Sequence, residues 1–140
     1  MTIERLDHLV LAVEAITDAL AGWRHALDLP AGEPHQPDRT HMQIAPLSLD
    51  SASGGAFLEA VQPTEPSHRV ARFLADRGEG MFSISLEVDD LDATVAALRA
   101  KGLPLSDPEP GVYPNTRVAR IPRADAHGVA VQLIERPQTS

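Results

Sequence analysis

The stretch LDHLVLAV, residues 6–13, sets the architecture of this 140-residue chain. Its large apolar residues alternate with other residues, as they do in a half-buried strand. One histidine, His8, lies among those apolar neighbours. A second stretch, FSISLEV (residues 82–88), repeats the alternation and is also followed by a helical pattern. The repeat places Ser83 where the first copy has His8, and it indicates two related halves.

Each half reads as strand, helix, strand, strand. The first half predicts strands over residues 6–13, 40–49 and 55–61, with a helix over 14–29 and a turn over 50–55. The second half predicts strands over 81–88, 115–122 and 129–135, with a helix that Asp89 and Asp90 begin and Gly102 ends. Between the halves, Ser67 is the expected N-cap of a helix that Gly78 ends.

The two halves also match residue by residue. HMQIAP (residues 41–46) aligns with RVARIP (117–122), and GAFLEAV (55–61) aligns with GVAVQLI (128–134), each about 75 residues apart. Chance rarely produces three strand matches at nearly one offset. Strand alternation then predicts which side chains share a face. The expected pairs are His8 with Ser83, Glu59 with Gln132, His41 with Arg117, and Gln43 with Ala119.

We therefore expect one α+β domain over residues 1–140. It would contain a first βαββ module (5–62), a connector with a helix (63–80) and a second βαββ module (81–136). Each module alone would leave one sheet face bare, so the two should pack together around a shared concave surface.

Composition excludes several classes of function. The net charge of −8 leaves no electrostatic route to general binding of nucleic acid or anionic membranes. The chain has no cysteine, so disulfides and thiolate ligands are excluded. No apolar run approaches the roughly 20 residues of a membrane span, and the first residues lead directly into a strand. A cytoplasmic protein is expected.

These modules resemble the vicinal oxygen chelate superfamily, which includes glyoxalase I, methylmalonyl-CoA epimerase, extradiol dioxygenases, and the fosfomycin and bleomycin resistance proteins. The resemblance lies first in LDHLVLAV. The second half is most similar to methylmalonyl-CoA epimerase, through VARFLADRGEGMFSISLEVDDLDATVAALRAKGLPL (70–105), RVARIP and GVAVQLIER (128–136). The resemblance implies tandem βαββ modules that form a curled eight-stranded mixed sheet around a cleft, and a homodimer.

The resemblance also implies a divalent metal held by four inward residues, which fall here on His8, Glu59, Ser83 and Gln132. His8 and Glu59 match the family pattern of His and then Glu or Gln, whereas Ser83 and Gln132 depart from His and Glu. A serine hydroxyl is a weak neutral ligand, and a glutamine carbonyl brings no charge. A site for Co, Mn, Ni, Zn or Mg on His8, Glu59 and Gln132 is therefore implied in weakened form or lost.

The proton-transfer carboxylates of the epimerases fall on Gln132 and near Gln43, and an amide cannot act as a general base. We expect His8 and Glu59 to meet in the cleft instead, as a weak metal site or as a metal-free acid–base pair. Arg117 would recognise a carboxylate or phosphate, unless it is a surface arginine. The other expected substrate-binding residues are Gln43, His41, Ser83 and Gln132.

The predicted activity is that of an isomerase, epimerase or lyase, which moves a proton next to the carbonyl or thioester of a small-molecule substrate. The alternative is a metal-free binding or resistance protein of the bleomycin-resistance type. An aromatic content of 4% argues mildly against stacking a flat drug. A scaffold or partner subunit without catalytic activity is the third hypothesis.

Overall fold

A computed structural model describes residues 2–49 and 55–137. The chain divides into two compact units. One unit spans His8–Phe82 and is called the N-unit; the other joins Met1–Asp7 to Ser83–Ser140 and is called the C-unit. The strands β1 (Ile3–Ala12) and β4 (Gly80–Val88) each contribute residues to both units.

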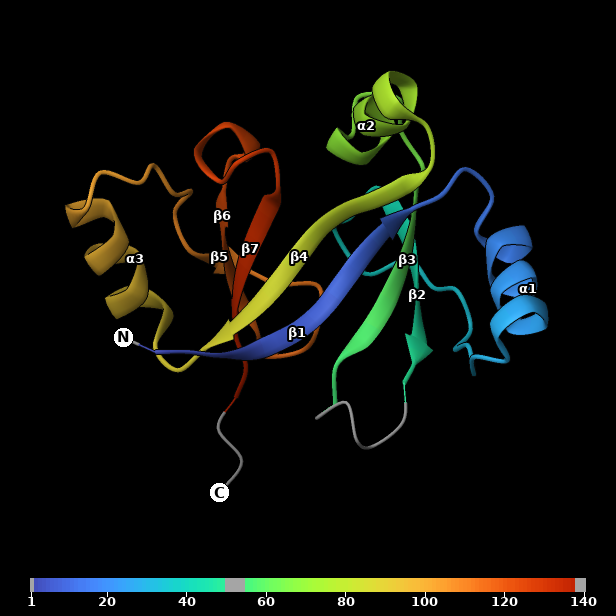
Figure 1. Cartoon of the computed structure of the whole chain (residues 1–140), viewed down its shortest axis with the longest axis horizontal. Coiled ribbons are helices and arrows are strands. Elements are labelled where there is room, and N and C mark those ends of the chain that lie inside the picture. Colours follow the sequence, from blue (N-terminus) through green and yellow to red (C-terminus); the bar gives the residue numbers. More distant parts are fainter. Residues whose placement is uncertain (1, 50–54, 138–140) are drawn as a thin grey trace. The chain divides into compact units, whose positions relative to one another are not determined.

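The N-unit contains three strands that pair in the order β2-β3-β1 (Figure 1). The central strand β3 (Phe57–Pro63) runs antiparallel to β2 (Met42–Ser48) and parallel to β1. The helix α1 (Ile16–Leu27) covers one face of these strands, and α2 (Arg69–Arg77) follows β3. The core under α1 is apolar and is formed by Val13, Ile16, Leu20, Ala45, Leu47 and Ala60.

The C-unit repeats the same pattern of strand pairing. Its order is β4-β7-β6-β5, in which β7 (Ala130–Glu135) runs parallel to β4 and antiparallel to β6 (Arg117–Ile121). The strand β5 (Glu109–Pro110) has two residues, and η2 (Arg123–Asp125) is a short 3-10 helix. The helix α3 (Leu91–Ala100) covers one face, over Val88, Leu91, Val95, Leu105, Ala119 and Leu133.

A polar side chain from one strand of each unit holds the N-terminus of that unit's helix. Gln62 Oε1 accepts a hydrogen bond from the Ile16 N–H at 2.8 Å, and Glu135 Oε2 accepts one from the Leu91 N–H at 2.6 Å. These bonds satisfy N–H groups that have no partner inside the helix. Asp90 also caps α3, by accepting a hydrogen bond from the Ala93 N–H. The same arrangement in both units fixes which face of each set of strands the helix covers.

The α+β class and the mixed strand pairing are confirmed, but the expected count of eight strands is not. The described residues form seven strands. In the N-unit, isolated bridges join Ala31 and His35 to β2, where the C-unit has the short strand β5 beside β6. The segment before β2 therefore pairs too briefly to count as a strand. The division into modules at residues 5–62, 63–80 and 81–136 stays a prediction.

Several local predictions can be compared with the structure. A proline such as Pro46 within a strand indicates an edge strand or a bulge, and β2 is the outer strand of the N-unit. The N-cap of α2 is His68 and not Ser67, because His68 Nδ1 accepts the hydrogen bond from the Val70 N–H at 3.1 Å. The four prolines in residues 103–114 predict a loop, and the structure has the short strand β5 within it. The predicted turn over residues 50–55 falls mostly outside the described residues.

Candidate functional site

The structure brings together two of the predicted site residues, His8 and Glu59. His8 lies on β1 and Glu59 on the neighbouring parallel strand β3, where His8 is paired with Phe57 and Glu59 with Val10. The Nε2 atom of His8 is 3.8 Å from Oε2 of Glu59. Both side chains are almost fully buried, with 2% and 4% of their surfaces exposed. The two groups can therefore interact where water screens them little.

An aromatic ring fixes the orientation of this pair. The imidazole of His8 stacks on the ring of Phe57, with the ring centroids 4.9 Å apart and the planes 17° from parallel. Phe57 is itself only half-buried. A buried carboxylate is costly without a partner, so the histidine explains how Glu59 is retained among apolar residues. Chemically, the pair offers a carboxylate that can accept a proton and an imidazole that can donate or accept one.

Ser83 and Gln132 lie in the C-unit and have contacts of their own there. Gln132 Nε2 donates a hydrogen bond to Ser85 Oγ at 3.0 Å, and Ser85 is fully buried. Ser83 is 8% exposed and is paired with Ala130 on β7. Of the four positions that the resemblance singled out, two are therefore in contact in the N-unit, and the other two belong to the second unit.

Arg117 has a partner within the C-unit. Its Nη1 and Nη2 atoms each donate a hydrogen bond of 2.9 Å to the carboxylate of Asp92 on α3. These bonds raise the pKa of Arg117 and lower the pKa of Asp92. Arg117 shares its strand face with Ala119, which packs under α3. The residue opposite Gln132 on β6 is Arg120, so Arg117 does not share a strand face with Gln132.

Gln43 and His41 also differ from the expected arrangement. Gln43 is paired with Gln62 and lies on the face of β2 that carries Ala45 and Leu47, under α1. His41 precedes β2, is 58% exposed, and contacts Glu65 with Nδ1 to Oε1 at 3.4 Å. Neither residue joins the His8–Glu59 pair. The two-residue periodicity of a strand does not say which of its faces the helix covers.

Two parts of this region were not predicted from the sequence. Phe57 was not singled out, although the parallel pairing of β1 with β3 sets it directly opposite His8. Asp7, the residue before His8, is fully buried and binds Arg136, with Nε to Oδ1 at 2.6 Å and Nη2 to Oδ2 at 2.9 Å. The position of Asp7 within an apolar strand could have indicated a buried carboxylate that needs a charged partner.

The donors present do not fit a divalent metal. Within residues 2–49 and 55–137, no group of three or more His, Asp or Glu side chains could hold an ion. His8 Nε2 and Glu59 Oε2 lie 3.8 Å apart, and the amide of Gln132 is hydrogen-bonded to Ser85. One imidazole and one carboxylate are too few protein donors for the sites that Zn or the harder ions prefer. The pair is better suited to acid–base chemistry of its own.

Comparison with known proteins identifies the family. A family model described as the Glyoxalase/Bleomycin resistance protein/Dioxygenase superfamily matches residues 7–119. The chain belongs to this superfamily, whose members typically use a divalent metal. No helix among the described residues has the length and apolar character needed to cross a membrane.

Relatives of the chain include a methylmalonyl-CoA epimerase. The mitochondrial epimerase of Bos taurus is 25% identical over 131 residues, which cover 92% of this chain and 73% of the relative. The uncharacterized protein YqjC of Bacillus subtilis (strain 168) is 27% identical over 95% of this chain and 93% of its own length.

Solved structures of epimerases match the fold closely. The epimerase of Mycobacterium tuberculosis has a TM-score of 0.87 at 28% identity, over 97% of this chain and 90% of that chain. The Streptomyces coelicolor epimerase in complex with 2-nitronate-propionyl-CoA has a TM-score of 0.87 at 24% identity, over 98% of this chain and 100% of that chain. The likeness to the epimerases of Bos taurus and Mycobacterium tuberculosis supports the isomerase class and leaves the substrate open.

Proposed function

We propose that the protein is an isomerase of the epimerase type, which moves the α-proton of a small acyl thioester or related carbonyl compound. His8 and Glu59 would carry the proton transfer without a metal. The observation that supports this proposal is the 3.8 Å contact between His8 Nε2 and Glu59 Oε2, in which both side chains are almost fully buried. Related epimerases with the same fold bind acyl-CoA ligands, which suggests the substrate class.

The two side chains would have different roles. The carboxylate of Glu59 removes the proton from the α-carbon, and the electron pair of that C–H bond moves toward the carbonyl oxygen. The imidazole of His8 donates a hydrogen bond to that oxygen and stabilises the enolate. Return of a proton to the same face gives exchange with solvent and no inversion. Return to the opposite face, from a water molecule, gives the epimer, and the hydroxide that is left takes the proton from Glu59, which restores the carboxylate.

Proton exchange in deuterated water tests the proposal. Propionyl-CoA and one epimer of methylmalonyl-CoA are incubated with the protein in D₂O, and proton NMR follows loss of the α-proton signal. Chiral analysis of the methylmalonyl group measures inversion in the same samples. We expect wild-type protein to catalyse exchange, and Glu59→Gln to slow it by roughly 10²–10⁴-fold, the contribution typical of a general base. Glu59→Gln keeps the shape of the side chain, so circular dichroism should show an unchanged fold.

The chain supplies a matched control. His41 and Glu65 form a second His–Glu contact, at 3.4 Å, with 58% and 46% of their side chains exposed. Glu65→Gln removes the same charge from an exposed pair and should leave exchange unchanged. Wild-type protein that exchanges neither thioester, or a Glu59→Gln variant that keeps the wild-type rate, would contradict the proposal. Saturable thioester binding without exchange would favour the binding-protein alternative.

A further inference from the structure

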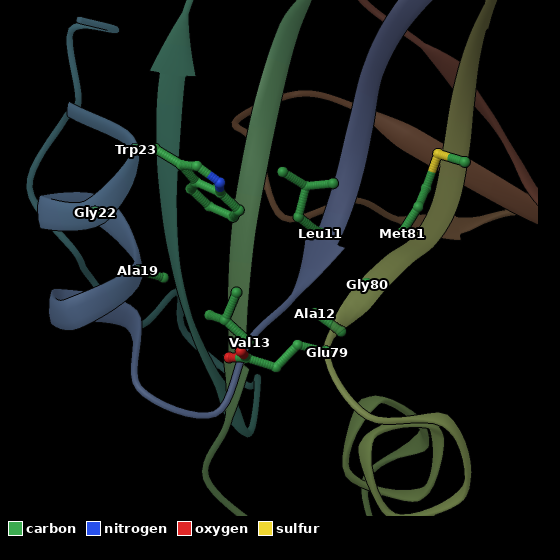
Figure 2. A pocket seen from close by; sticks show the side chains of 9 residues that line it. All are labelled: Leu11, Ala12, Val13, Ala19, Gly22, Trp23, Glu79, Gly80 and Met81. Atoms are coloured by element: carbon green, nitrogen blue, oxygen red, sulfur yellow. The ribbon is translucent and has the colours of Figure 1, made fainter. Parts of the chain in front are cut away.

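A cavity lies in the N-unit, between α1 and the strands β1 and β4 (Figure 2). Its volume is about 410 Å³, and Figure 2 labels the nine residues that line it. Leu11, Ala12 and Val13 line this cavity on one side, and the opposite wall is α1, which packs on Ala60, the neighbour of Glu59 on β3. Successive strand residues point to opposite faces. The cavity therefore opens on the opposite face of these strands from the His8–Glu59 pair.

Two glycines keep the cavity open. Gly22 lies inside α1, and Gly80 begins β4. Neither has a positive φ angle, so the backbone at these positions does not require glycine. A Cβ atom at either position would meet no heavy atom within 4 Å. A glycine inside a helix is less favourable than alanine, and its effect at position 22 is to leave space in the cavity.

The walls are mostly apolar and carry one charge. Trp23, Leu11 and Met81 line the cavity, and Met81 is 55% exposed (Figure 2). Glu79 is the one charged residue in the lining. Its Oε2 accepts a hydrogen bond from the Glu14 N–H at 2.9 Å. No arginine, lysine or histidine among the described residues forms an ion pair with this carboxylate.

We propose that this cavity is a binding site for a small cation with a flat apolar ring, such as an arylalkyl ammonium. The volume lies in the range of small-molecule pockets. The indole of Trp23 offers an aromatic face for a ring or a cation. The carboxylate of Glu79 offers a charge-assisted hydrogen bond to an ammonium group. The site is independent of the proposed acid–base pair.

Tryptophan fluorescence tests this proposal directly, because Trp23 is the only tryptophan in the chain. Phenethylammonium is titrated into the protein. Two compounds with the same ring serve as comparisons: phenylacetate, which is negatively charged, and 2-phenylethanol, which is neutral. We expect saturable quenching or a spectral shift with phenethylammonium. Half-saturation should need roughly tenfold less of it than of phenylacetate, a difference typical of one charge-assisted contact.

Variants of the cavity walls and of the charged residue test each part of the site. Gly22→Leu and Gly80→Leu each fill the cavity from a different wall, and both should weaken binding by roughly tenfold or more. Glu79→Gln should abolish the preference for phenethylammonium over phenylacetate. Glu65→Gln, a charge change at an exposed residue outside the lining, should leave the quenching by phenethylammonium unchanged. Unaltered quenching in both filled variants would overturn the proposal. Sedimentation that shows a wild-type dimer and a Gly22→Leu monomer would also overturn it, because a second copy would then occupy the cavity.

Discussion

At the scale of single residues, two carboxylates of the described part of the chain are buried, and they have different partners. Glu59 contacts the imidazole of His8, whereas Asp7 contacts two guanidinium groups, those of Arg136 and Arg5. Asp7 is fully buried, and the Arg136 side chain is 29% exposed. The hydrogen bonds from Arg136 to Asp7 raise the pKa of that arginine. The ion pair joins the first strand to the residue that follows the last strand, so its role is structural.

Asp7→Asn should therefore destabilise the protein, and the contact between His8 and Glu59 should stay unchanged. The substitution leaves the guanidinium of Arg136 without its charged partner, and breaking a largely buried pair of this kind costs roughly 3 kcal/mol. Urea unfolding followed by circular dichroism measures the change. Glu4→Gln, an exposed charge change on the same strand, is the control and should stay within about 0.5 kcal/mol of wild type. A stability of Asp7→Asn equal to that of Glu4→Gln would mean that the ion pair contributes nothing.

At the scale of the elements, α3 is attached to its strands by an apolar face and by polar contacts at its first turn. Leu91 and Val95 pack on Ala119 and Leu133. Asp92, in the first turn, receives both hydrogen bonds from Arg117 on β6. A negative charge at this position also suits the partial positive charge of a helix N-terminus. Arg117 thus attaches α3 to β6, and its predicted role in binding a ligand stays a prediction.

The Arg117–Asp92 contact predicts a dependence of stability on pH. The pKa of Asp92 in the folded state lies below its ordinary value of 3.8, because Arg117 favours its charged form. The stability from this contact is thus present above pH 3.8 and is lost as the pH falls through the folded-state pKa. Arg117→Gln should be less stable than wild type at pH 7, and the difference should narrow below pH 3.8.

Chemical denaturation at a series of pH values measures this narrowing. Arg72→Gln makes the same charge change at an exposed residue of α2 that has no ion pair with any described residue. It should differ little from wild type at each pH. Added salt should also reduce the effect of Arg117→Gln, since the pair is solvent-exposed. The stability difference between wild type and Arg117→Gln could instead stay constant from neutral pH down to well below the pKa of Asp92. That result would show that the contact acts through packing and not through charge.

At the scale of the whole molecule, the protein has a fold whose relatives typically use a divalent metal, but its described donors do not form a metal site. Thermal unfolding with millimolar Co²⁺, Mn²⁺, Ni²⁺ or Zn²⁺, and with a chelator control, should give no concentration-dependent rise in Tm. A metal present at a free concentration of 100 times its Kd would add about 2.7 kcal/mol to the free energy of unfolding. A rise in Tm that His8→Asn abolishes would place a metal on His8 after all.

The fold class, the family and the two residues at the centre of the candidate site could be predicted from the amino-acid sequence alone. Period-two alternation in residues 6–13 and 82–88, and apolar stripes at helical spacing, are local signals, so they can be read without a structure. The family resemblance, and not the alternation, predicted that His8 and Glu59 would meet, and they lie in contact.

Which other residues lie near the His8–Glu59 pair could not be predicted, because tertiary contacts determine it. Alternation divides a strand into two faces, but the pairing of neighbouring strands and the position of the covering helix determine which face is which. For that reason Gln43 and Arg117 lie on helix-covered faces, Phe57 stacks on His8, and Gln132 binds Ser85. The cavity beside Trp23 could not be predicted from the sequence either. It depends on the space between α1 and two strands that are far apart in the chain.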